Sequence, residues 1–156
     1  MVLLTGGVSV GDYDYVVEAV SACGITQHFH KIKQRPGKPL FFGTIGEKPV
    51  FGLPGNPSSV LSCFYMYVSP CIAILSGRDN RIKKSSSILV NDYKKPKDLT
   101  CFLKGNEKDG QVTALDAQES FRLSSFAQAN CLIELEEERE LYKAGETVTI
   151  HLLTFG

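Results

Sequence analysis

The stretch Phe51–Ser59, FGLPGNPSS, joins an apolar, strand-like run to a long apolar segment at 60–75. Pro54-Gly55 predicts a tight, rigid turn. Asn56 followed by Pro57 is typical of a helix start, because asparagine caps the helix and proline at the first helical position loses no hydrogen bond. The first N–H groups of this helix would attract an anion. From these residues alone, a corner that merely ends a strand is an equally good interpretation.

Strands and helices alternate around this corner. Strands are expected at 2–5, 25–34, 40–45 and 50–53, the first of them buried, and helices at 14–23 and 57–75. This alternation predicts an α/β layer architecture. Further short strands, expected at 88–93, 99–105, 111–116, 131–136 and 147–153, predict a small all-β barrel or sandwich. We therefore expect an α/β domain at 1–76, a polar linker at 77–87 and a small β-barrel at 88–156.

The composition is that of an ordinary globular protein, with 156 residues, 43% apolar residues and a formal net charge of zero. A neutral chain has no long-range field that draws it to nucleic acid or to an anionic membrane. The apolar run 60–75 is shorter than the roughly 20 residues that span a bilayer, which predicts a buried helix. Five cysteines occur singly, without a Cys-x-x-Cys pair. They predict buried thiols in a reducing compartment, by default the cytoplasm.

A glycine-rich loop, TGGVSVGDYD at 5–14, lies between the first strand and the first helix. Open α/β sheets bind ligands at this position. The loop lacks the lysine of a Walker motif and the Gly-x-Gly-x-x-Gly of a dinucleotide fingerprint. Asp12 is a candidate ligand for a divalent cation such as Mg²⁺. Asp14 is better explained as the cap of the following helix.

A basic stretch, HFHKIKQRPGKP at 28–39, gathers Lys31, Lys33, Arg35 and Lys38 in an otherwise neutral chain. Arginine binds oxyanions bidentately, and lysine binds them as a point charge. Strand alternation places Lys31, Lys33 and Arg35 on one face. A solvated edge strand that carries lysines explains this pattern equally well.

In this order and spacing, the motifs TGGVSVGDYDY, RPGKPLFFG and GLPGNPSS resemble the molybdopterin molybdotransferase family, which includes bacterial MoeA and the E domain of gephyrin. SSFAQANCLIEL and AGETVTIHLL resemble the small barrel of that family, so the resemblance covers essentially the whole chain. It implies that 1–76 is the C-terminal part of a MogA-like three-layer α/β domain, followed by the family's small β-barrel. It also implies that the chain is a C-terminal fragment, inactive alone, whose sheet exposes an unpaired edge.

The function implied by the resemblance is that of a cytosolic enzyme of molybdenum cofactor biosynthesis. Such an enzyme inserts molybdate into adenylylated molybdopterin, releases AMP and uses Mg²⁺. The resemblance further implies a homodimer for the full-length protein and a molybdopterin adenylyltransferase as a candidate partner, with no nucleic acid and no membrane. The alternative is a non-catalytic scaffold or dimerisation module of the gephyrin type. Asp12 together with the basic stretch favours the enzyme, because a scaffold needs neither.

The resemblance also assigns site residues position by position. Asp12 matches the acidic residue of the family's active site, where it acts through the metal. Lys104 stands where the family usually has arginine, which weakens the expectation of bidentate oxyanion binding at that position. The other substrate-binding positions lie in the glycine-rich loop, the basic stretch, the corner and the barrel: Gly6, Gly7, Ser9, Lys31, Arg35, Lys38, Pro54, Gly55, Asn56, Pro57, Ser59 and Ser125.

Overall fold

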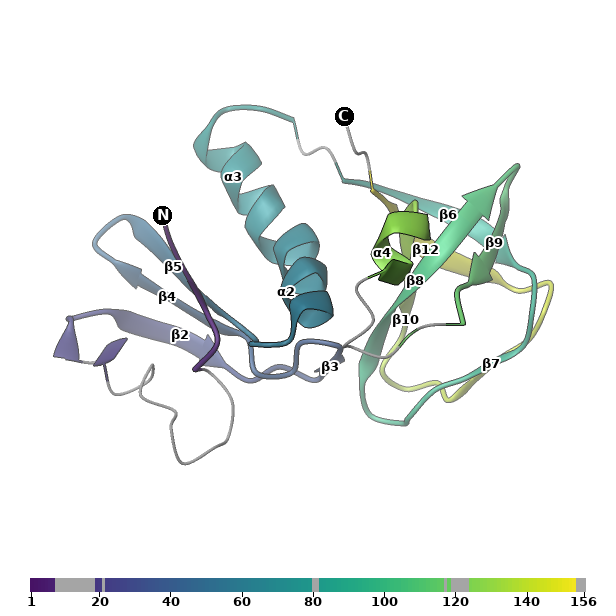
Figure 1. The fold of residues 1–156 in the computed structure, drawn as a ribbon, viewed down its shortest axis with the longest axis horizontal. Helices are drawn as coiled ribbons and strands as arrows, with labels where there is room; N and C mark the ends of the chain where they lie inside the picture. The colour runs from purple at the N-terminus through teal and green to yellow at the C-terminus, as the bar shows by residue number, and fades with distance from the viewer. Residues whose placement is uncertain (8–18, 21, 80–81, 117, 119–123, 154–156) are drawn as a thin grey trace.

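The computed structural model describes residues 1–7, 19–20, 22–79, 82–116, 118 and 124–153. A helical segment stands between a four-stranded sheet and a β-barrel (Figure 1). The chain thus contains an α/β part followed by a small barrel, which confirms the predicted fold class. Residues 19, 20 and 22 are helical. The rest of the helix predicted at 14–23 lies almost entirely outside the described residues.

The four-stranded sheet has the order β1-β5-β4-β2. Its strands are β1 (Val2–Thr5), β2 (Thr26–His30), β4 (Phe41–Ile45) and β5 (Lys48–Leu53). β1 runs parallel to β5, whereas the β4–β5 and β2–β4 pairs are antiparallel. Gly46 and Glu47 form the two-residue turn between β4 and β5, because Ile45 pairs with Lys48 across the hairpin.

The prediction that the first strand is buried is wrong. Val2 and Leu3 are each 42% exposed and Leu4 is 36% exposed. An all-apolar run is typical of a strand covered on both faces. In the described part of the chain, however, β1 is the edge of its sheet and pairs only with β5. The expected exposed edge is therefore this strand.

The helix predicted at 57–75 is confirmed as three consecutive segments, α2 (Pro57–Cys63), the π-helical turn η1 (Phe64–Val68) and α3 (Ser69–Leu75). One side packs on the sheet through a cluster that includes Leu40, Phe51 and Leu53. Another side packs on the barrel. With 19 residues, this helix is long and apolar enough to cross a membrane. Length and composition alone are weak evidence for a membrane-spanning helix, since the core helix of a soluble protein meets the same criteria.

The barrel closes in the order β10-β12-β6-β9-β8, because β10 also pairs with β8. Its strands are β6 (Lys83–Leu89), β8 (Thr100–Lys108), β9 (Gln111–Ala114), β10 (Cys131–Leu135) and β12 (Thr147–Leu152). β7 (Tyr93–Lys94) pairs with β11 (Leu141–Tyr142), and α4 (Ser124–Gln128) precedes β10. Asp109 and Gly110 both have positive φ, as a two-residue hairpin turn requires.

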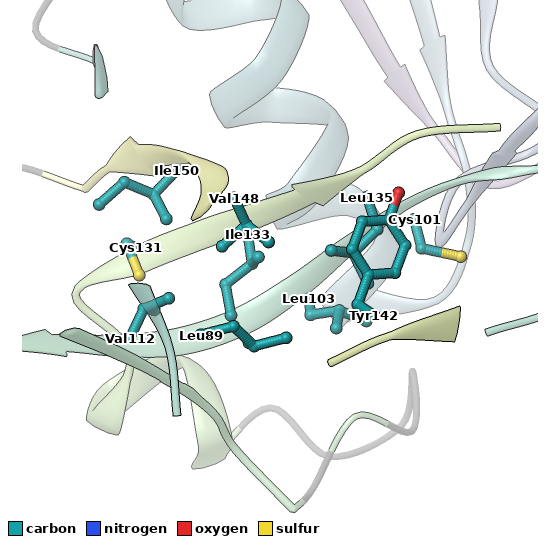
Figure 2. Packing of buried hydrophobic residues seen from close by; sticks show 10 residues of the cluster. All are labelled: Leu89, Cys101, Leu103, Val112, Cys131, Ile133, Leu135, Tyr142, Val148 and Ile150. Carbon is teal, nitrogen blue, oxygen red and sulfur yellow. The ribbon is translucent and has the colours of Figure 1, made fainter. Parts of the chain in front are cut away.

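The barrel interior is filled by apolar side chains that meet from its strands and from β11 (Figure 2). The buried members of this cluster are Leu89, Cys101, Leu103, Val112, Cys131, Ile133, Leu135, Tyr142, Val148 and Ile150. Close-packed interiors of this kind contribute most of the stability of a small domain.

The strand predicted at 25–34 is wrong in its second half. Lys31 has a φ of 69°, which ends β2, and the two-residue strand β3 (Gln34–Arg35) then leaves the sheet to pair with β8. Lys31, Lys33 and Arg35 therefore do not share one strand face.

The strand predicted at 88–93 starts earlier, at Lys83, inside the segment interpreted as a linker. β6 pairs along its length with β12, so backbone hydrogen bonds support a sequence too polar to indicate a strand.

The prediction of buried thiols holds for Cys63, Cys101 and Cys131. It is wrong for Cys23, which is exposed just after the first helical residues, and Cys71 is half-buried.

Truncation of the barrel core should destabilise the protein far more than truncation at the barrel surface. We expect Ile133→Ala, at a fully buried position, to lower the free energy of unfolding by about 2–5 kcal/mol. Ile88→Ala is the matched control, since Ile88 is 38% exposed, and it should cost less than about 1 kcal/mol. Equilibrium urea denaturation measures both. Equal losses would contradict the assigned core.

Candidate functional site

The start of the glycine-rich loop lies against the FGLPGNPSS corner. Both follow the ends of parallel strands, because β1 pairs with β5. The Gly6 N–H donates to the Leu53 carbonyl at 3.0 Å. A Cβ added to Gly55 would lie 3.5 Å from the Gly6 Cα, so the two backbones approach closely. This juxtaposition places Gly6, Gly7 and the corner at one edge of the sheet.

The corner has the local chemistry that the sequence predicted. The Asn56 side chain accepts a hydrogen bond from the Ser58 N–H at 3.2 Å, and Pro57 occupies the first helical position. Asn56 is therefore the N-cap of α2. The next two side chains, Ser58 and Ser59, are buried with 1% and 6% exposure. The corner thus holds two serine hydroxyls rigidly at the start of the helix.

The segment Arg35–Lys38, called here the cation loop, begins at the last residue of β3. Arg35 lies opposite Cys101 of β8, and the Arg35–Pro36 peptide bond is cis. Gly37 has a φ of 93°, a conformation that favours glycine. The Ile32 N–H donates to the Lys38 carbonyl at 2.9 Å, which closes the loop at its base. The Arg35 and Lys38 residues at its ends are exposed to solvent.

A pocket of about 750 Å³ lies between the cation loop and the barrel. Arg35, Lys38 and Ser59 line one side of it. The barrel side has an apolar wall made by Tyr93, Leu99, Phe102, Leu103 and Leu115. Its polar lining includes Asp92, Lys94, Asp116 and Gln118. Concave sites of this size, with an apolar wall and a few polar groups, are typical of small-molecule sites.

The described lining of the pocket carries three cations, Arg35, Lys38 and Lys94, and two carboxylates, Asp92 and Asp116. Asp92 accepts from Lys143 at 2.7 Å and from the Ala144 N–H at 2.9 Å, and the Lys143 hydrogen bond lowers the pKa of its carboxyl. This carboxylate is thus ionised but already paired. Burial raises the pKa of Tyr93 and of the Cys101 thiol, so both stay neutral near pH 7.

Lys104 brings a buried ammonium group to the other side of the corner. Lys104 is 3% exposed, its Nζ donates to the Ser58 Oγ at 3.4 Å, and it lies 5.6 Å from the centre of the Phe126 ring. The Gln118 side chain holds both backbone groups of Lys104, accepting from its N–H at 2.9 Å and donating to its carbonyl at 2.8 Å. Ser125 is also buried, in α4. Lys104 and Ser125 are not among the described residues that line the pocket.

The structure thus places most of the residues that the sequence singled out in three groups. Arg35, Lys38 and Ser59 line the pocket. Lys104 approaches the same corner from the barrel, through Ser58. The residues of the adjoining sheet edge and corner are Gly6, Gly7, Pro54, Gly55, Asn56 and Pro57. Lys31 precedes the cation loop in the chain and is exposed to solvent. It is not among the described residues that line the pocket.

Two predicted residues, Ser9 and Asp12, lie outside the described residues. Within the described part of the chain, no group of three or more His, Cys, Asp or Glu side chains is placed to hold a metal ion. Mg²⁺ keeps several of its waters and needs only one or two carboxylates besides substrate phosphates. Asp12 as a ligand of Mg²⁺ therefore stays a prediction.

Sequence reasoning missed four residues that shape the site: Gln34, Ser58, Tyr93 and Gln118. Ser58 adjoins a residue that was singled out, so its position in the corner was a usable signal. The other three are ordinary polar residues in short or irregular segments. Only the packing of distant segments brings them together, and no local pattern indicates this.

Two protein-family models match the chain. The model described as "Probable molybdopterin binding domain" matches residues 1–73, and the model described as "MoeA C-terminal region (domain IV)" matches residues 87–153. The molybdopterin molybdenumtransferase of Haemophilus influenzae is 40% identical over 98% of this chain and 40% of its own length. The Drosophila melanogaster molybdenum cofactor synthesis protein cinnamon is 33% identical over 99% of this chain and 27% of its own length.

The fold agrees with these relatives. The solved structure of a molybdopterin biosynthesis MoeA protein from Pyrococcus horikoshii superposes with a TM-score of 0.77 and 29% identity, over 100% of this chain and 38% of that one. The chain spans about 40% of the length of the Haemophilus relative, so the similarity covers only part of the whole relative.

The thiols should differ sharply in reactivity. Burial raises the pKa of Cys63 and of Cys131 to about 12, so at about pH 8 their reactive thiolate fraction is on the order of one in ten thousand. A colorimetric thiol reagent should therefore modify exposed Cys23 fastest in the native protein. Cys23→Ser should remove the fast phase and Cys63→Ser should leave it intact. Rapid modification of Cys63 without denaturant would contradict this burial.

Proposed function

Because this chain belongs to the molybdopterin molybdenumtransferase (MoeA) family, we propose that it forms part of an enzyme that inserts molybdate into adenylylated molybdopterin and releases AMP. The observation that carries the proposal is the pocket between the cation loop and the barrel, which Arg35, Lys38 and Ser59 all line. This arrangement offers two cations and a hydroxyl to one oxyanion.

The chemistry of these groups suits molybdate, a tetrahedral dianion. Hydrogen bonds from a charged donor to an oxyanion are roughly twice as strong as neutral ones, and arginine can make two at once. Solvent screens Arg35 and Lys38, since both are exposed, which limits what each contributes alone. The buried Ser59 hydroxyl adds an uncharged donor. Exposed cations attract the anion, and the buried hydroxyl fixes its position.

Lys104 is proposed as a further positive charge for the same substrate. Its ammonium group is buried beside Ser58, close to the pocket residue Ser59 in the chain. A buried charge is screened less than an exposed one and acts at longer range. Lysine binds an oxyanion as a point charge rather than as a fork, so Lys104 contributes attraction without fixing an orientation. Ser125, in α4, is proposed as a further hydroxyl that binds the substrate.

The remaining parts of the proposal concern the larger substrate. The apolar wall with Tyr93 and Phe102 offers a surface for a planar pterin ring. The close approach of Gly6 and Gly55 leaves backbone free to contact a ligand at the neighbouring edge. Asp12 would hold Mg²⁺, which when bound neutralises phosphate charge. A homodimer, a molybdopterin adenylyltransferase partner and a cytoplasmic reaction complete the proposal.

The pocket favours an enzyme over a non-catalytic scaffold. A scaffold binds through an exposed groove and does not require cations gathered with a buried hydroxyl. Soaking crystals with molybdate or tungstate separates the two. Oxyanion density between Lys38 and Ser59 supports the enzyme, whereas a peptide bound along the barrel with the pocket empty supports the scaffold.

Lys38→Ala should weaken molybdate binding. The expected loss is about 1–3 kcal/mol, the range for a charge-assisted hydrogen bond. Isothermal titration with molybdate measures it. Lys48→Ala is the matched control, because Lys48 is an exposed lysine on the β4–β5 hairpin, outside the pocket. Equal affinities of the Lys38 variant and the wild type would remove Lys38 from the site.

AMP release from adenylylated molybdopterin, in the presence of molybdate and Mg²⁺, tests the function itself. We expect release from a protein that carries this chain with the remainder of the relatives' length, and none from the chain by itself. Pockets that lose walls lose the positioning on which rate depends.

Asp12→Asn should fold normally and abolish the Mg²⁺ stimulation. Undiminished Mg²⁺ stimulation in that variant would show that Asp12 is only a loop residue.

A further inference from the structure

The two cations of the pocket depend on a short loop for their positions. Arg35 and Lys38 are exposed at the two ends of the cation loop, and the residues between them are Pro36 and Gly37. Long exposed side chains are mobile, so their separation is set mainly by where the backbone holds their Cα atoms. The contacts that fix this backbone are therefore of interest beyond the residues that face the pocket.

The side chain of Gln34 supplies most of those contacts. It is 3% exposed, and its Nε2 donates to the Pro36 carbonyl at 2.9 Å. The same nitrogen lies 3.5 Å from the Gly37 carbonyl oxygen and 3.5 Å from the Cys63 Sγ. A buried side-chain amide thus satisfies the carbonyls in the middle of the cation loop, in place of a strand or helix partner. Removing it would leave these carbonyls without this donor.

Tyr67 fixes the orientation of that amide. Its hydroxyl donates to the Gln34 Oε1 from the π-helical turn η1. Burial raises the pKa of Tyr67 to about 12, so the hydroxyl keeps its proton and remains a donor over the whole physiological range. Since the amide oxygen is occupied by Tyr67, the amide nitrogen must face the loop.

Packing leaves the loop no freedom on this side. A Cβ added to Gly37 would lie 2.3 Å from the Cys63 Sγ and 2.7 Å from the Gln34 Nε2. Real Cβ atoms do not approach other atoms this closely, so the loop backbone rests directly on Gln34 and on helix α2. Tyr67, Gln34 and Gly37 thus form one continuous contact from the helix to the loop.

We propose that Gln34 and Tyr67 are positioning residues for the oxyanion site: Tyr67 orients the Gln34 amide, which holds the cation loop so that Arg35 and Lys38 face the pocket together. Gln34 is also one of the lining residues of the pocket, and it holds the loop through the Pro36 and Gly37 carbonyls. Tyr67 is not among the described lining residues and acts through Gln34. The proposal rests on the proposed function, because it requires that the pocket binds an oxyanion.

A double-mutant cycle on molybdate affinity tests the proposal. Tyr67→Phe and Gln34→Leu should each weaken binding about fivefold, the effect of one net hydrogen bond. The double variant should bind no worse than Gln34→Leu alone, because residues of one network are not additive. In the AMP-release assay, made with a protein that carries this chain and the remainder of the relatives' length, Tyr67→Phe should raise the KM for molybdate more than it lowers kcat.

The matched control is Tyr142→Phe, which removes a hydroxyl that accepts from the Glu136 N–H at 2.7 Å inside the barrel. It should lower the melting temperature and leave molybdate affinity unchanged. Tyr67→Phe keeps the ring and its packing, so it remains informative if Gln34→Leu does not fold. A Tyr67→Phe protein that melts earlier but binds molybdate like the wild type would overturn the proposal. If the wild type itself binds no molybdate, the proposed oxyanion site and this inference fail together. If the wild type binds molybdate and Tyr67→Phe binds it equally well, only this inference fails.

Discussion

The pairing of β3 with β8 is the interaction on which the pocket depends. Gln34 lies opposite Thr100 and Arg35 opposite Cys101, and the Thr100 N–H donates to the Lys33 carbonyl at 2.9 Å. This short ladder takes the chain out of the four-stranded sheet and carries the cation loop to the barrel (Figure 1). A two-residue strand supplies few hydrogen bonds, so it needs the buried Gln34 amide and the helix behind it for support.

The site separates attraction from positioning. Arg35 and Lys38 are exposed, where a cation reaches a dissolved anion and raises its local concentration. Ser58, Ser59 and Lys104 are buried, where a polar group is held in one place by its neighbours. Burying a polar group is costly unless it is hydrogen-bonded, and the Lys104–Ser58 contact partly meets that requirement across the two parts of the chain. The same contact therefore joins the barrel to the corner.

The sequence predicted the features that have local chemistry. The Asn56 cap, the Gly46-Glu47 and Asp109-Gly110 turns, the long helix and most barrel strands follow from propensity and periodicity. It did not predict the left-handed backbone of Lys31 or the β3–β8 pairing, which arise from contacts between segments far apart in the chain. It also did not predict a strand at the polar start of β6. The reason is the same, because the partner strand β12 lies far away in the sequence, near the C-terminal end of the chain. Local pattern thus indicated the cation loop and the corner but not the barrel wall that faces them.

The π turn at Phe64–Val68 sets a constraint on how this helix can evolve. Its hydrogen bonds span five residues, as in the bond from the Ser69 N–H to the Phe64 carbonyl, so it holds one residue more than an α-turn. Deleting one residue there would therefore restore an ordinary α-helix and leave the segments on either side nearly in phase, because the π turn is an α-turn that accommodates one extra residue. The helix packs on the sheet with one side and on the barrel with another. A residue deleted from α2 or α3 would instead rotate everything beyond it by about 100° and put these contacts out of phase. A change of length should therefore be tolerated at the π turn and selected against in α2 and α3, so that the π turn is the place where this helix can gain or lose a residue during evolution.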